Sequence, residues 1–211
     1  LGYTHSKPIL TQMNNGKWAA IIGNGQGGDA ADATAGQAQL FIVYLDGPGG
    51  DGVWDLGKDY LRISTDEGAV DTALSAAADA AAVAAAAAAD VAAAAAKRAA
   101  ADAANSAKRA AADSAATAAA LAAVAAAAAA DAVTASRNAL FSPIGIDHDV
   151  TPDGRFDVIY AGDLYGNLWR FDVSGSSERS WSSPVKPFFK GDKTRPITAT
   201  PAVGIAPAGV T

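Results

Sequence analysis

The residues best suited to chemistry lie in one short stretch, 149–157, which reads Asp-Val-Thr-Pro-Asp-Gly-Arg-Phe-Asp. Its oxygen-bearing side chains recur at alternate positions, and a tightly curled loop can aim alternate side chains at one point. Calcium takes about six to eight oxygen ligands at about 2.3–2.6 Å, so this spacing predicts a Ca²⁺ site. The expected ligands are the side chains of Asp149, Thr151, Asp153 and Asp157 and the carbonyl of Arg155, with Gly154 making the sharp turn.

The residues on either side predict that this loop joins two antiparallel strands. Residues 143–146 and 156–161 are rich in β-branched and aromatic side chains. A helix-loop-helix calcium motif has a bidentate glutamate at its last position, where this chain has Tyr160, so we do not expect an EF-hand. The alternative is a plain turn without metal. Carboxylates crowded together without a cation would repel one another, which would raise their pKa values.

Two other stretches resemble binding motifs but lack essential parts. Residues 51–55 repeat the Asp-Gly-x-x-Asp half of the calcium motif, yet the preceding ligand positions are Gly47 and Gly49, which carry no side-chain oxygen. A Gly-rich turn is therefore expected there. Residues 23–28 are also Gly-rich, but no helix start with a suitable lysine follows, so we expect an inter-strand loop and no phosphate site. Without a nucleophile-base arrangement, the chain is not expected to be an enzyme.

The composition divides the chain into three segments. Residues 69–136 are overwhelmingly alanine, and the flanks hold all four Trp, five Tyr and six Phe, so the flanks must form the β core. The net charge of −6 argues against nucleic acid or an anionic membrane as partner, since both need clustered cations. The only basic clusters are Lys97-Arg98 and Lys108-Arg109. Weak calcium sites fill outside the cytosol, which favours an exported protein.

The two flanks contain a repeat. Residues 7–10, 15–18 and 40–46 of the first copy correspond to residues 142–145, 153–156 and 168–173 of the second, and a third copy begins at 200–203. Short strands, Gly turns and recurring aromatics are typical of four-stranded β-propeller blades, and a small β-sandwich is the alternative. We expect an all-β, partial β-propeller of about two blades, with Trp18, Trp169 and Phe171 in its core. The expected segments are a first blade region at 1–68, a helical insertion at 69–136, and a second blade with the calcium loop and the start of a third at 137–211.

Several of these motifs are similar to those of the PilC/PilY type IV pilus tip proteins, specifically to their C-terminal propeller. The resemblance covers about residues 1–65 and 137–205, and its most specific part is the run 160–172, Tyr-Ala-Gly-Asp-Leu-Tyr-Gly-Asn-Leu-Trp-Arg-Phe-Asp, directly after the metal loop; residues 1–3, 7–8, 15–19 and 23–25 also match.

This resemblance implies a calcium site in the loop and a fragment of a larger secreted protein, exported through the periplasm to the pilus tip or outer membrane. It also implies that calcium occupancy regulates pilus extension and retraction or surface attachment, with minor pilins and a host or surface ligand as partners. The alternatives are a propeller of a quinone-dependent dehydrogenase or an integrin-like calcium-binding surface propeller.

The alanine segment departs from that family and predicts helix, because alanine loses no side-chain entropy and the stretch has no Pro or Gly after Gly68. An insertion must return to neighbouring points of its host, so we expect a helical hairpin that turns near 104–106. Arg98, Asp102, Arg109 and Asp113 would share one face of a single helix that runs through that turn. One continuous helix is therefore the alternative. Asp and Lys residues interrupt the segment, so no membrane span is expected.

Overall fold

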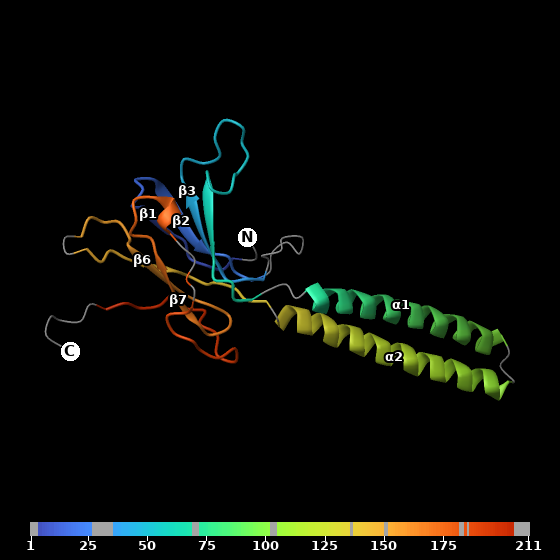
Figure 1. Cartoon of the computed structure of the whole chain (residues 1–211). Helices are drawn as coiled ribbons and strands as arrows, with labels where there is room; N and C mark the ends of the chain where they lie inside the picture. The colour runs from blue at the N-terminus through green and yellow to red at the C-terminus, as the bar shows by residue number, and fades with distance from the viewer. Residues whose placement is uncertain are drawn as a thin grey trace. The chain divides into compact units, whose positions relative to one another are not determined.

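The computed structural model describes residues 4–26, 36–68, 72–101, 105–135, 137–149, 152–181, 184 and 186–204. The chain forms two compact units, one from Leu1–Ala69 with Arg137–Thr211, and the other from Val70–Ser136. Figure 1 shows antiparallel strands in the first unit and a pair of helices in the second. The metal-loop residues lie in the first unit.

The first sheet consists of β1 (Ile9–Gln12), β2 (Trp18–Gly23), β3 (Gln39–Tyr44) and β4 (Tyr60–Ser64), antiparallel and in sequence order. Side chains alternate between the faces of a strand, so Ala19 and Ile21 of β2 point into the core and are fully buried. The prediction that Trp18 belongs to the core is wrong, because the same alternation places it on the outer face, where it is 54% exposed.

The second sheet consists of β5 (Ile144–Ile146), β6 (Val158–Gly162) and β7 (Leu168–Asp172), again antiparallel and in sequence order. Trp169 and Phe171 of β7 are buried, as predicted. At the position of a fourth strand, Phe189 makes an isolated antiparallel bridge to Leu168. The antiparallel β architecture is therefore confirmed for the flanks. In the described part of the chain both sheets are open, and closure into a propeller stays a prediction.

One hydrophobic core joins the two sheets, with residues of β2, β3, β6 and β7 in a single buried cluster. The buried Asn24 side chain joins their backbones, since its Oδ1 accepts from the Gln39 N–H at 3.0 Å and the Leu140 N–H at 2.9 Å. Gly23 lies so close to this junction that a Cβ there would collide with the carbonyl oxygens of Leu140 and Phe141. The two flanks thus form one unit although the alanine segment separates them in sequence.

The helical unit is a hairpin of α1 (Thr72–Ala101) and α2 (Ser106–Ala135), 30 residues each. The predicted hairpin is confirmed and the single continuous helix is wrong. Of the predicted turn at 104–106, residue 104 lies outside the described residues, and Asn105 caps α2 by accepting from the Ala107 N–H at 3.1 Å.

The half-buried residues of the hairpin are spaced alternately three and four apart, which is the seam of a coiled coil. All are alanine except Val133, the last of the following list: 78, 81, 85, 88, 92, 95 and 99 in α1, and 112, 115, 119, 122, 126, 129 and 133 in α2.

Both helices are long and apolar enough to cross a membrane by length and composition, over Ala76–Ala101 and Ser106–Val133. Nearly all of that hydropathy comes from alanine, which buries little area per residue. Asp79, Asp90, Asp113 and Asp131 interrupt the two segments. Length and composition therefore do not by themselves make this hairpin a membrane span, which charged residues near its middle would oppose.

Candidate metal centre

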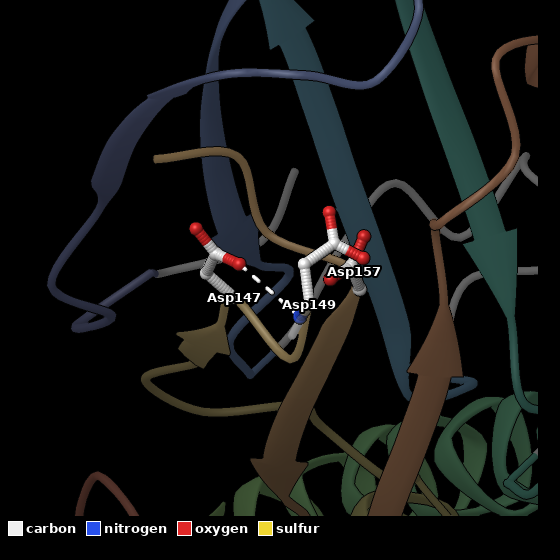
Figure 2. Close-up of side chains that lie close together, drawn as sticks. All are labelled: Asp147, Asp149 and Asp157. Atoms are coloured by element: carbon white, nitrogen blue, oxygen red, sulfur yellow. Dashed lines mark hydrogen bonds between the residues drawn. The ribbon is translucent and has the colours of Figure 1, made fainter. Parts of the chain in front are cut away.

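The loop between β5 and β6 gathers three carboxylates. Asp147 directly follows β5, Asp149 lies two residues further on, and Asp157 directly precedes β6. One ligand oxygen from each lies within 4.8 Å of the other two (Figure 2). As predicted, the loop joins two antiparallel strands, and the short β5–β6 pairing brings its two ends together.

Hydrogen bonds fix two of these carboxylates. Asp157 is only 6% exposed and accepts from the His148 N–H at 2.9 Å and from the side-chain amide of Asn14 at 3.3 Å. Asp147 accepts from the Gly154 N–H at 2.7 Å and from the Asp149 N–H at 3.4 Å, the second of which is drawn in Figure 2. Each bond uses part of the acceptor capacity of a carboxylate, which has about four lone-pair sites. Oxygen capacity therefore remains for a cation.

Asp149 shows the electrostatic consequence of this crowding. Its pKa is raised above the ordinary value, first by the negative charge of Asp157, then by partial desolvation and by the charges of Asp153 and Asp147. His148 opposes these effects. The predicted repulsion is confirmed for this residue. A cation in the cluster would relieve the repulsion that now favours the protonated form.

The predicted ligand set and the observed cluster overlap in part. Asp149 and Asp157 come together, whereas Asp153 accepts from the Arg155 N–H at 2.9 Å and lies 3.8 Å from its Nε. Thr151 lies outside the described residues. Asp147 was not predicted, although a signal was present: it extends the alternate spacing of the motif by one step toward the N-terminus.

A polar hollow of about 210 Å³ adjoins the cluster. Besides Asp149 and Asp157 it contains an ion pair of Arg170 and Asp172, with Nη2 and Oδ2 3.5 Å apart. The remaining lining residues are Asn14, His148, Val158 and Ser174. The hollow can hold a hydrated cation, because water occupies about 30 Å³ per molecule in the liquid.

The residues present fit a hard cation such as calcium. All three clustered groups are carboxylates, and the raised pKa of Asp149 shows that it feels the negative charge of its neighbours. Three carboxylates are fewer than the six to eight oxygens that calcium takes, so backbone carbonyls, the rest of the loop or water would supply the remainder.

The other acidic loop, residues 46–59, is arranged differently. Lys58 places its ammonium 3.3 Å from an oxygen of Asp55 and 3.9 Å from oxygens of both Asp51 and Asp59. This internal cation stands among three carboxylates, two of which belong to the Asp-Gly-x-x-Asp sequence. The lysine lies outside that motif, so the motif alone does not reveal this arrangement.

Two curated proteins are similar to this chain in sequence. The type IV pilus biogenesis factor PilY1 homolog of Xylella fastidiosa is 25% identical over 186 residues, which cover 88% of this chain and 8% of that protein. The type IV pilus biogenesis factor PilY1 of Pseudomonas aeruginosa is 23% identical over 199 residues, covering 91% of this chain and 10% of that protein. The chain thus spans a tenth or less of the curated relatives it matches.

No family model matches the sequence. Among solved structures, the C-terminal domain of Pseudomonas aeruginosa PilY1 aligns with a TM-score of 0.47 and 20% identity, over 96% of this chain and 29% of that one. The similarity therefore rests on the sequence matches, which extend over both β flanks and across the alanine segment. They show that most of this chain is similar in sequence to part of the type IV pilus biogenesis factor PilY1.

Proposed function

We propose that this chain is a calcium-binding part of a type IV pilus biogenesis factor at the cell surface, and that it has no catalytic role. The observation that carries calcium binding is the approach of the Asp147, Asp149 and Asp157 oxygens to within 4.8 Å of one another. The names of the relatives support the pilus role.

In this proposal the ligands are Asp147, Asp149 and Asp157, with Thr151, Asp153 and the Arg155 carbonyl completing the shell. Asp153 now accepts from the Arg155 N–H and faces its guanidinium, so it would exchange that ion pair for the metal. Both groups are substantially exposed, and an exposed ion pair contributes little, which keeps the cost of the exchange small.

Calcium at this site would reach beyond its own loop, because Asn14 connects the loop to the first sheet. Asn14 lies in the turn between β1 and β2. Its side-chain amide donates hydrogen bonds to the Asp157 carboxylate, to the Phe156 carbonyl at 3.1 Å and to the Val173 carbonyl at 3.0 Å. A cation that fixes Asp157 therefore also fixes the contact between the sheets. We propose that this calcium-dependent surface is what minor pilins or an attachment ligand recognise, so that occupancy regulates pilus extension and retraction or surface attachment.

We further propose that the two sheets are blades of a β-propeller that other parts of a longer chain complete. Support comes from the shared order of strands in the two sheets and from a hollow lined by apolar side chains of β2, β3, β4 and the loop between β3 and β4. Ile22, Phe41, Val43, Trp54 and Tyr60 line a hollow of about 450 Å³. A neighbouring blade would cover such a face.

Calorimetric calcium titration of the whole chain, combined with urea unfolding in calcium and in chelator, tests the metal site. We expect one saturable site and, at about 100 times the dissociation constant, a gain of about 2.7 kcal/mol in unfolding free energy. Asp149→Asn is the sharpest variant, because it removes a proposed ligand and also relieves repulsion. It should lose calcium binding while keeping the stability of the parent chain in chelator.

Asp51→Asn is the matched control, since it makes the same charge change in the loop that contains Lys58. It should retain the full calcium response. No binding at millimolar calcium, or equal calcium responses in the parent chain and Asp149→Asn, would reject the site and reduce the motif to a turn.

A further inference from the structure

The turn end of the helical hairpin brings together the two basic pairs of the chain. Lys97 and Arg98 lie near the end of α1, and Lys108 and Arg109 lie in the first turn of α2. All four side chains are exposed. Residues 97–109 contain one acidic residue, Asp102, so this end is cationic although the whole chain has a net charge of −6. We call these four residues the basic tip.

Helix stability does not explain the basic tip. Cations are favourable near the C-terminus of a helix, which suits Lys97 and Arg98, but unfavourable near the N-terminus, where Lys108 and Arg109 lie. The first turn of α2 itself contains no acidic residue. Alanine at both positions would also be a better helix former. The second basic pair therefore opposes the local preference of its helix.

A hollow between the helices lies within the basic tip. It measures about 320 Å³ and is lined by Ala95, Arg98, Lys108 and Ala111. Lys108 precedes Ala112 by four residues, so it continues the three-and-four spacing of the seam, where alanine stands in the following layers. A guanidinium and an ammonium thus border one hollow with small walls. Arg presents a planar fork and Lys a point charge, and both suit phosphate oxygens.

The sides of the hairpin point to the source of that phosphate. Among the described residues the seam is alanine except for Val133, whereas four other large aliphatic side chains lie outside it: Val83, Val91, Leu121 and Val124 are 63–70% exposed. A water-soluble coiled coil places its large aliphatic residues in the seam. Helix pairs in lipid show the reverse, with small residues between the helices and larger ones outside.

We propose that the basic tip docks on an anionic lipid bilayer, with Arg98 and Lys108 binding headgroup phosphates and Lys97 and Arg109 lying beside them. Val91, the exposed aliphatic residue nearest the tip, would enter the headgroup region, while Val83, Leu121 and Val124 lie beyond Asp90 and Asp113 and stay outside it. Asp90 and Asp113 limit the depth, because a carboxylate is costly in the hydrocarbon layer. The hairpin thus touches the membrane without crossing it. The net charge of −6 is a property of the whole chain. The four cations of the hairpin are gathered at its turn end, so this end can bind an anionic surface.

Vesicle binding by the whole chain tests this proposal. Phosphatidylcholine vesicles with and without phosphatidylglycerol are titrated, and bound protein is measured by flotation. We expect binding to the anionic vesicles only, weakening as salt is raised. Each cation near an anionic surface contributes about a factor of five, so Arg98→Gln with Lys108→Gln should weaken binding by roughly 25-fold. Glutamine is a good helix former, and circular dichroism checks that helicity is kept.

The matched control is Lys186→Gln with Lys190→Gln, which removes two exposed cations from the β unit and should leave binding unchanged. Equal binding to neutral and anionic vesicles would overturn the proposal, as would tip and control variants with equal affinity. A duplex DNA oligonucleotide and inorganic phosphate serve as competitors. Tighter binding to the oligonucleotide than to anionic vesicles, or full displacement by millimolar phosphate, would overturn the bilayer as the source of the anion.

Discussion

Two loops of this molecule carry the same Asp-Gly-x-x-Asp sequence and treat their charge in different ways. In residues 51–55 the carboxylates surround Lys58, which supplies a cation from within the chain. In residues 153–157 one aspartate faces Arg155 and the other joins the acidic cluster, where the pKa of Asp149 is raised. The motif therefore gives a turn that gathers acidic groups. The cation that faces these groups is set by other positions, Lys58 outside the first motif and Arg155 at a variable position within the second.

The two loops also differ in how far water reaches their charged groups. The first loop has three carboxylates on one lysine, and the lysine and two of the carboxylates are about half exposed, so water stabilises them as well. The second loop holds Asp157 in a buried position and leaves Asp149 exposed beside it. An external cation would therefore meet less internal compensation in the second loop than in the first. This difference leads us to place calcium there and not in the first.

The largest expected effect concerns a third way to hold a carboxylate, by hydrogen bonds alone. Asp163 is fully buried and accepts from the Asn138 amide at 2.8 Å, the Trp169 Nε1 at 2.8 Å, and the backbone and side-chain N–H groups of Asn167 at 2.7 and 3.0 Å. Asp163→Ala would leave these donors without their acceptor, which costs about 1–3 kcal/mol for each buried group that stays unpaired. We expect a loss of about 4 kcal/mol in urea unfolding followed by tryptophan fluorescence.

Asp163→Asn is the control for charge, because it keeps one acceptor oxygen. It should lose clearly less stability than Asp163→Ala. If both variants lose equally, negative charge and not the number of acceptors holds these donors, and this site would belong with the two cation-dependent loops.

A smaller effect is expected from the second lysine that neutralises a carboxylate, Lys17. Its Nζ lies 2.8 Å from Glu178, which also accepts from the Tyr44 hydroxyl at 2.8 Å and the Asn15 amide at 3.0 Å. The pKa of Glu178 is lowered, first by the Lys17 bond and then by Tyr44, while burial opposes the shift. The folded state therefore binds this proton less strongly than the unfolded chain does.

It follows that the stabilisation by Glu178 is complete above the ordinary glutamate pKa of about 4.3 and is lost as the pH falls through the lower folded value. Because Lys17 is 40% exposed, we expect at most about 1 kcal/mol. Urea unfolding as a function of pH measures it. Glu178→Gln should flatten the acid limb and leave the calcium response in place. An unchanged acid limb would show that other carboxylates, such as Asp172 with its lowered pKa, carry the pH dependence.

Much of the fold follows from patterns that the sequence displays locally. β-Branched and aromatic residues on both sides of the metal motif predict β5 and β6, and an alanine run without Gly or Pro predicts α1 and α2. The prediction for Trp18 failed because a β-branched or aromatic run shows that a strand exists but not which face is buried. That depends on which neighbour covers each face.

The sequence predicted where the acidic cluster lies but not which residues form it. Alternate spacing selected Asp149 and Asp157, yet the exchange of Asp153 for Asp147 depends on how the loop curls, which sequence spacing does not specify. The contributions of Asn14 and Lys58 were not visible either. Asn14 lies 143 residues from Asp157 in sequence, and Lys58 acts through a turn that brings its ammonium back over three aspartates.

The smallest expected effect tests the comparison of the two loops most directly. Lys58→Met removes the internal cation and keeps a side chain of similar length, leaving Asp51, Asp55 and the buried Asp59 without it. Because the lysine is 56% exposed, the loss of stability in chelator should stay below about 1 kcal/mol. The informative result is the change in calcium response, since three carboxylates without a lysine would resemble the cluster at 147–157. We expect a second, weaker calcium event in calorimetry, absent from the parent chain. If Lys58→Met shows no second calcium event, the same motif fails to bind metal even without the lysine. The backbone conformation of the loop, and not the presence of Lys58, would then separate the two sites.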